Sequence, residues 1–266
     1  MIDAIIQHEG CRIPTRTAGL EVSLASTPQE IRRAQRLRWQ VFHDEMGAKL
    51  KSPEPGLDID YFDRYCDHLL VRDKATREAV ACTRVLFRER AAAAGSFYSQ
   101  TEFDMRVITL LPGRVLEVGR TCVRRDYRGR AALAVLWSGI GRILGTGAAD
   151  YLFGCASIPV EGDGANVEAV MRALRAGHMS PPDVRVQPRL RLPRVEPPAG
   201  MDAGRIPPLL KAYLRMGAVV CGEPFWDRDF NAADVFVLVD TRRMQGRYMH
   251  HFMERATAPW ARSARS

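Results

Sequence analysis

The sequence lacks the features of a membrane-spanning or secreted chain. No apolar run reaches the length of about 18 residues that a transmembrane helix needs. The first ten residues, MIDAIIQHEG, have no basic start followed by a long apolar stretch, so we expect no signal peptide. With 266 residues, of which 46% are hydrophobic, the chain has the composition of a folded globular protein. These observations favour a cytoplasmic location.

Common nucleotide and metal motifs are also absent. There is no G-x-G-x-x-G and no G-x-x-x-x-G-K, which argues against dinucleotide and ATP sites. None of the six cysteines forms a C-x-x-C pair, so we expect buried free thiols and no metal site.

Lysine is scarce: it supplies four of the 39 basic residues, and arginine carries most of the net charge of +8. The basic excess is concentrated in residues 172–211 and 241–266. Such a surface suits an acidic partner, either nucleic acid, anionic lipid or an acidic carrier protein, although it is equally compatible with simple solvation. The arginines lie in a proline-rich segment and a tail, without a recognisable nucleic-acid-binding motif. A nucleic-acid-binding protein is therefore a remote alternative, and no nucleic-acid partner is expected.

Hydrophobic periodicity predicts strands alternating with helices. Thr27 and Glu30 form a capping box, and Pro28 occupies the first helical position of a helix that ends at Gly47. The residues from 180 to 208 read as a proline-rich loop with at most one edge strand. Further strands are expected at 20–25, 68–72, 79–87, 116–123, 151–157, 219–221 and 234–239, and further helices at 99–105, 131–144, 166–176 and 208–216. This order predicts an α/β domain with one mixed sheet flanked by helices.

The stretch from Leu116 to Trp137 predicts an anion site. A strand leads through the turn Tyr127–Ala131 into a helix, whose first turn offers unpaired N–H groups and a partial positive charge. Four arginines surround this turn: Arg124, Arg125, Arg128 and Arg130.

This turn, VRRDYRGRA, resembles the V-x-P-x-Y-R-G-x-G pattern of the GNAT acyltransferase superfamily. The resemblance implies a single GNAT-like domain with a mixed, mostly antiparallel central sheet, spanning 20–240 between an extension (1–19) and a basic tail (241–266). It also implies binding of a coenzyme A or phosphopantetheine phosphate by Val123, Arg128, Gly129, Arg130 and Ala131. The proline of the pattern is absent, and Ala131 and Leu133 replace small residues, so the close approach of a pyrophosphate is restricted. The single phosphate of a carrier-protein arm still fits.

Other segments narrow the resemblance. Glu117 and Arg120 match the E-x-x-R signature of acyl-homoserine-lactone autoinducer synthases. The R-x-x-x-F motif of these synthases is matched by Arg38 and Phe42. Their acidic loop is matched by Asp60 and Asp63, and their strand arginine by Arg84. The chain also resembles bacterial ornithine-lipid N-acyltransferases in the segments LRWQVF, DHLLV, GSFYSQTEFD, LEVGRTCV, LFGCASIP and PPLLKAYLRMGA.

This resemblance implies transfer of a 3-hydroxyacyl chain from acyl carrier protein to the α-amine of L-ornithine, with the thioester as co-substrate and no bound cofactor. The alternative is an N-acyl amino acid or acyl-homoserine-lactone synthase that uses the same donor.

Amine attack on a thioester needs a base, and Glu117 is the candidate. The alternative role of Glu117 is an ion pair with Arg120. In a regular strand, however, the side chains of residues 117 and 120 would point to opposite faces. A bulge at Gly119 would align them and free a backbone N–H for the oxyanion. Tyr127 is a candidate acid for the leaving thiolate, or a packing residue.

The acceptor presents a carboxylate and a second ammonium. Arg84 or Arg120 suits the carboxylate, and Asp60 or Asp63 suits the ammonium. The alternative for the acidic cluster is a solvated loop that caps helices.

The tail predicts attachment to an anionic membrane. Tyr248, Phe252 and Trp260 alternate with arginines, and each arginine contributes about 1 kcal/mol near an anionic surface at low salt. Deleting residues 243–266 should lower co-sedimentation with anionic vesicles while soluble acyl transfer stays mostly intact. Unchanged vesicle binding would contradict this role, and lost soluble activity would assign the tail to the carrier protein or to the fold.

Overall fold

The computed structural model describes residues 19–129, 131–198 and 206–243. Within them the main sheet has the strand order β1-β2-β3-β5-β6-β10-β8, and β9 pairs with β10. The bounds are β1 Leu20–Leu24, β2 Asp67–Asp73, β3 Ala79–Phe87, β5 Val115–Val123, β6 Tyr151–Pro159, β8 Val219–Val220, β9 Phe225–Asp227 and β10 Ala232–Asp240. All pairs are antiparallel except β5 with β6. The expected mixed, mostly antiparallel sheet is confirmed.

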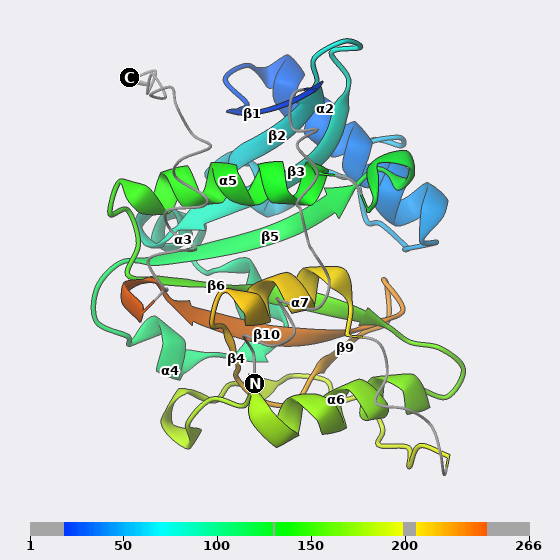
Figure 1. Cartoon of the computed structure of the whole chain (residues 1–266), viewed down its shortest axis with the longest axis vertical. Helices are drawn as coiled ribbons and strands as arrows, with labels where there is room; N and C mark the ends of the chain where they lie inside the picture. The colour runs from blue at the N-terminus through cyan, green and yellow to red at the C-terminus, as the bar shows by residue number, and fades with distance from the viewer. Residues whose placement is uncertain (1–18, 130, 199–205, 244–266) are drawn as a thin grey trace, which may run out of the picture.

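The single parallel pair is short. It joins residues 115–117 of β5 to residues 151–153 of β6. Beyond Glu117 the two strands separate, β5 toward β3 and β6 toward β10 (Figure 1). Because the ladder stops in mid-sheet, the backbone there is available to a ligand.

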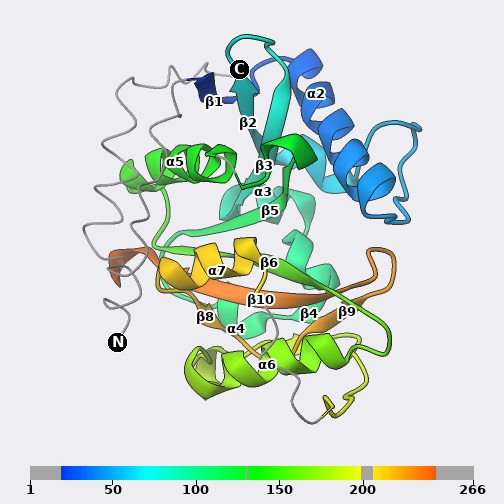
Figure 2. The same cartoon turned by 45° about the vertical axis from the view of Figure 1, so that its right-hand side comes forward.

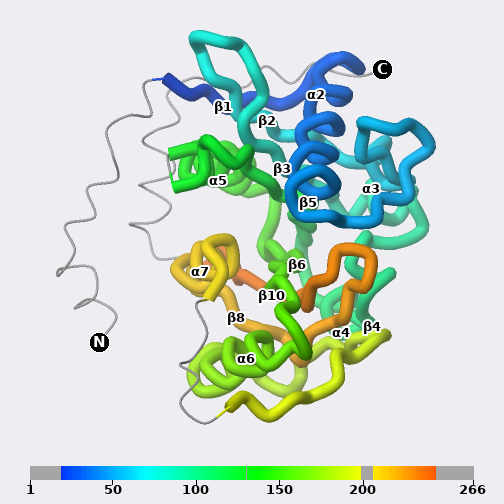
Figure 3. Tube along the Cα trace, turned by 90° about the vertical axis from the view of Figure 1, so that its right-hand side faces the viewer, coloured from blue at the N-terminus to red at the C-terminus, as the bar shows by residue number. Residues whose placement is uncertain are grey.

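Helices cover both faces of the sheet (Figures 2 and 3). On one face lie α5 (Ala132–Gly145) and α7 (Pro208–Arg215), and the residues of α6 (Ala165–Gly177) pack into the same core. On the other lie α2 (Pro28–Trp39) and α3 (Arg88–Ala94). The strand residues alternate accordingly: Leu116 and Val118 join the α5–α7 core, so Glu117 between them faces the opposite side.

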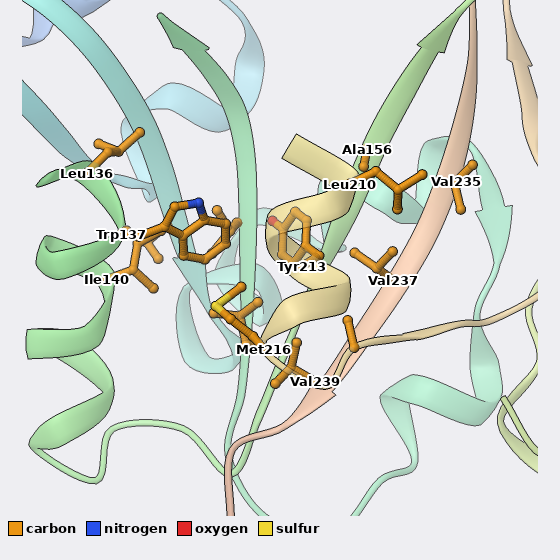
Figure 4. Packing of buried hydrophobic residues seen from close by; sticks show 14 of the residues in the cluster. Leu136, Trp137, Ile140, Ala156, Leu210, Tyr213, Met216, Val235, Val237 and Val239 are labelled. Carbon is orange, nitrogen blue, oxygen red and sulfur yellow. The ribbon is translucent and has the colours of Figure 1, made fainter. Parts of the chain in front are cut away.

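The α5–α7 core is centred on an aromatic contact (Figure 4). The rings of Trp137 and Tyr213 meet edge to face, with centroids 5.0 Å apart. Val235, Val237 and Val239 of β10 pack beneath α7. A second cluster on the other face includes the stacked rings of Phe153 and Phe236.

Most of the predicted elements are present. The Thr27 side chain caps α2 by accepting from the amide of Glu30, and the helix continues as a π-helical turn over Gln40–Glu45 that buries Val41 and Phe42. The described cysteines, 66, 82, 122, 155 and 221, are free as expected. Within the described ranges, no helix is long and apolar enough to cross a bilayer.

The helix predicted at 99–105 is wrong. The segment forms a 3-10 turn (Tyr98–Thr101), strand β4 (Phe103–Asp104) and the start of α4 (Arg106–Thr109). Ser99 does not cap a helix, because its amide and hydroxyl donate to Glu117. β4 pairs with β7 (Gln187–Pro188), so the predicted edge strand of the proline-rich segment exists but belongs to a separate two-stranded sheet. α3 and β9 had no clear sequence signal.

The N-terminal extension, Arg130 and the tail from residue 244 lie outside the described residues. The domain boundaries at 19 and 241 therefore stay predictions.

The close contact of β5 and β6 generates a stability prediction. A Cβ on Gly154 would lie 2.2 Å from the carbonyl oxygen of Val118, which is backbone and cannot turn aside. Gly154→Ala should therefore lower the free energy of unfolding by about 1–3 kcal/mol, measured by urea denaturation. The control Gly177→Ala, at the end of α6 with no atom within 4 Å, should leave it unchanged or slightly raised. Equal stability of the two variants would contradict the proposed packing.

Candidate active site

A cavity of about 90 Å³ lies where β5 and β6 separate. β5 contributes Glu117, Gly119 and Arg120, and the π-helical turn contributes Phe42. The opposite wall comes from the 3-10 turn, β6, β9 and β10, and includes Tyr98, Ser99, Glu102, Cys155, Ser157, Asp227, Phe230 and Asp234. Four residues selected from the sequence thus meet in one cavity.

A β-bulge in β5 shapes this cavity. Arg84 pairs with Gly119 and Cys82 with Cys122, so two steps along β3 match three steps along β5. The extra residue is accommodated at Arg120, whose φ of 52° is left-handed and unusual for a residue with a side chain. The predicted bulge is therefore present, with its strained residue one position after Gly119.

The bulge brings Glu117 and Arg120 to the same side of the strand. Glu117 accepts a hydrogen bond from the amide of Tyr98, and Arg120 donates to the Tyr98 hydroxyl. The Arg120 guanidinium also lies 4.8 Å from the centre of the Tyr98 ring. The opposite orientation expected for a regular strand does not occur.

The Glu117 carboxylate is buried and well held. It accepts from the amides of Tyr98 (2.8 Å) and Ser99 (2.7 Å) and from the Ser99 hydroxyl. Burial raises its pKa, and the hydrogen bonds from Ser99 and Tyr98 offset only part of that effect. Such a carboxylate is a stronger base than an exposed one once it is ionised.

Arg120 does not form the alternative ion pair with Glu117. Its Nε lies 3.3 Å from Oδ2 of Asp58, and its Nη2 lies 3.5 Å from Oδ2 of Asp60. Because the side chain is 14% exposed and lines the cavity, it is also accessible to a ligand.

Behind Arg120 lies a buried network of balanced charge. Arg38 contacts Asp58 (2.9 Å) and Asp63 (2.7 Å), and Arg84 contacts Asp60 (2.5 Å) and Asp63 (2.9 Å). Burial alone would raise the pKa of Asp60 and Asp63, but the attraction of Arg84 and Arg38 lowers both. Together with Arg120, three arginines face three aspartates.

The positions of these residues bear on two alternatives that the sequence left open: whether the acidic cluster is a solvated loop, and whether Arg84 or Arg120 is accessible to the acceptor carboxylate. The acidic cluster is not a solvated loop, since Asp58 and Asp63 are almost fully buried, although Asp60 also accepts from the amides of Phe62 and Asp63. Of the two arginines considered for the acceptor carboxylate, Arg120 lines the cavity, whereas Arg84 is enclosed by the aspartates.

The predicted anion-binding turn lies at the far end of β5. Gly129 adopts a left-handed φ of 75°, and α5 begins after Ala131 without a side-chain cap. Arg128 pairs with Glu45 and donates to the carbonyl of Val123. The Tyr127 hydroxyl donates to Asp73 at 2.8 Å, a bond that raises its pKa, and Tyr127 does not line the cavity. Arg130 lies outside the described residues.

Comparison with known proteins identifies the family to which this chain belongs. The model of the acetyltransferase (GNAT) domain matches residues 37–138. The L-ornithine N(alpha)-acyltransferase of Rhodobacter capsulatus is 35% identical over 88% of this chain and 95% of its own length. That of Brucella abortus is 34% identical over 89% of this chain and 90% of its own. The chain belongs to the L-ornithine N(alpha)-acyltransferase family.

A solved structure of another enzyme has the same fold as this acyltransferase. A coenzyme-A-dependent acyl-homoserine lactone synthase, solved with SAM and isopentyl-CoA, superposes with a TM-score of 0.51 and 16% identity, covering 91% of this chain and 90% of that one. At this identity the likeness concerns the fold alone.

Several residues of this acyltransferase site were missed from the sequence. Ser99 and Glu102 were predicted only as the cap of a short helix, although Ser99 donates to Glu117 and Glu102 lines the cavity. Tyr98, Asp227 and Asp234 were not predicted as site residues. Asp234 carried one available signal, because it is an acid within the otherwise apolar strand AADVFVLV.

Proposed function

We propose that this enzyme transfers a 3-hydroxyacyl chain from acyl carrier protein to the α-amine of L-ornithine and releases lyso-ornithine lipid. The observation that carries the acceptor assignment is the identity of 35% to a named L-ornithine N(alpha)-acyltransferase over 88% of the chain. The buried carboxylate of Glu117, which lies on the bulged strand β5, supports acyl transfer as the reaction.

In the proposed step the neutral α-amine attacks the thioester carbonyl carbon. A C–N bond forms and the C–S bond breaks. The ionised Glu117 accepts the amine proton, directly or through water, and passes it to the leaving thiolate, which departs as the free thiol. A backbone N–H left unpaired by the bulge near Gly119 stabilises the oxyanion.

The acceptor carboxylate binds Arg120 in this scheme. The guanidinium contacts Asp58 and Asp60 at 3.3 and 3.5 Å, longer than optimal charge-assisted hydrogen bonds. A carboxylate within the cavity offers the same guanidinium a closer partner. Arg38, Arg84, Asp60 and Asp63 then act on the substrate indirectly, by holding Arg120 in its left-handed conformation, and Phe42 closes the wall.

The donor arm binds at the N-terminus of α5. The helix has no side-chain cap, so its first N–H groups are available to a phosphate, and left-handed Gly129 shapes the turn in front of them. The proposed phosphopantetheine contacts are Val123, Arg128, Gly129, Arg130 and Ala131. Arg128 contacts the phosphate while it remains paired with Glu45. Reversible attachment to an anionic cytoplasmic membrane surface, where the amphiphilic product leaves, belongs to the same proposal.

An end-point assay tests the function directly. Purified enzyme, 3-hydroxyacyl carrier protein and L-ornithine should yield N-acylated ornithine by mass spectrometry. An acyl-homoserine lactone formed from SAM instead would support the alternative synthase, whose E-x-x-R pattern the chain shares.

Glu117→Gln should lower the rate of acyl transfer by about 100-fold or more, because the proton acceptor is lost. The wild-type rate should rise with pH through the pKa of Glu117, which burial raises, because only the ionised form accepts a proton. The control Ser99→Ala removes one donor to the carboxylate and should cost far less. Circular dichroism checks that both variants fold. Near-normal turnover of folded Glu117→Gln would exclude Glu117 as the base.

The donor preference is a separate prediction. Ala131 and Leu133 stand where the GNAT pattern has smaller residues, so the turn should accept one phosphate more readily than a pyrophosphate. Carrier-protein thioesters should show a higher kcat/KM than coenzyme A thioesters of equal chain length, measured by thiol release. Equal kcat/KM for the two donors would contradict this reading of the turn.

A further inference from the structure

A second group of carboxylates lines the same cavity, opposite the arginine network. Glu102 follows the 3-10 turn, Asp227 ends β9 and Asp234 lies in β10. One oxygen from each lies within 4.8 Å of the others. Three separate segments of the chain therefore converge on one small volume. We call these three residues the acidic triad.

Two members of the acidic triad have an unsatisfied oxygen. Oε2 of Glu102 and Oδ1 of Asp234 are buried without a hydrogen-bond partner, and the two residues are only 4% and 6% exposed. Leaving a buried carboxylate oxygen unpaired is costly, so the arrangement is incomplete as it stands. Both residues line the cavity, which is where a partner has access.

The surroundings do not neutralise the acidic triad. Tyr98 and Cys155 face Glu102, Ser157 faces Asp234, and the amides of Asp229 and Phe230 donate to Asp227. The cation acting on Glu102 and Asp234 is Arg120, whose guanidinium contacts Asp58 and Asp60. Burial, together with repulsion from neighbouring carboxylates, raises the pKa of Asp234 to about 6 and that of Glu102 well above its usual range.

We propose that the acidic triad binds the side-chain ammonium of a diamino acid acceptor and so selects ornithine over neutral amino acids. The inference rests on the proposed function and corrects the sequence-based assignment of the ammonium to Asp60 or Asp63, which are already paired with arginines. An ammonium has three N–H donors and fits the unpaired oxygens of Glu102 and Asp234.

The same contact explains why the α-nitrogen would be the one acylated. Nearby carboxylates favour the charged form of an ammonium, and a protonated nitrogen has no lone pair for attack. In this proposal the α-amine lies by contrast beside Glu117 and the Arg120 guanidinium, which both contact Tyr98, and the positive charge of Arg120 disfavours a second ammonium there. The two ends of the acceptor are thereby held in different protonation states.

The test compares L-ornithine with L-norvaline, which has the same carbon skeleton without the side-chain amine. Wild-type enzyme should prefer ornithine by about 100-fold or more in kcat/KM, because loss of the amine leaves the buried oxygens unpaired. Glu102→Gln and Asp234→Asn should reduce this preference to less than about 10-fold, mainly through a higher KM for ornithine. The control Asp229→Asn changes a partly exposed carboxylate on the same hairpin, paired with Lys51, and should keep the preference.

Calorimetric binding of each amino acid without donor gives a second readout. Wild-type enzyme should bind ornithine more tightly than norvaline, and the triad variants should not discriminate. Thermal denaturation should show no loss of stability in these variants, because they remove buried like charges.

Three results would overturn the assignment. The first is an undiminished ornithine preference in the folded variants. The second is an equal loss of kcat on both amino acids, which would make the triad part of proton transfer. The third is activity abolished by EDTA and restored by Mg²⁺ or Ca²⁺, with the ion lost from the variants. If wild-type enzyme acylates neither amino acid, the proposed function fails, whereas selective ornithine binding that disappears in the variants would still support the triad.

Discussion

The extra residue in β5 is the constraint on which the site depends. By adopting a left-handed backbone, Arg120 lets Glu117 and its own side chain reach the same face of the sheet. A left-handed φ in a residue with a side chain costs about 1–3 kcal/mol, so the surrounding contacts must hold it. Asp58, Asp60 and the Tyr98 ring do so, which makes the buried aspartates part of the geometry of β5.

The cavity has two walls of opposite electrostatic character. On one side three arginines and three aspartates neutralise one another, and the pKa shifts of Arg38, Arg84, Asp60 and Asp63 favour their charged forms. On the other side, Glu102 and Asp234 of the acidic triad have raised pKa values and unsatisfied oxygens. A zwitterionic ligand with an additional ammonium is complementary to this asymmetry. Arg120 stands between the walls and acts on both.

Local signals made much of the fold predictable. The Thr27 cap, the apolar run 79–87 and the strand–turn–helix around Gly129 rest on backbone and capping preferences that a short segment carries by itself. The helix expected at 99–105 failed because a non-local partner, Glu117, binds the amide and hydroxyl of Ser99, the residue expected to cap that helix. The short strand β9 is defined chiefly by its pairing with β10, which lies later in the chain.

The sequence by itself determined the fold class and the family resemblance and selected Glu117 and Arg120 as candidates, because these depend on motifs within single segments. Only the tertiary structure decided which charges are paired. Asp60 and Asp234 are both acids in the sequence, yet Asp60 forms ion pairs with Arg84 and Arg120, whereas Asp234 lines the cavity and has no ion-pair partner among the described residues. That difference arises from strand order and burial, which bring residues 102, 227 and 234 together across about half of the chain. Since electrostatic energy depends on distance and burial, spacing along the chain cannot determine it.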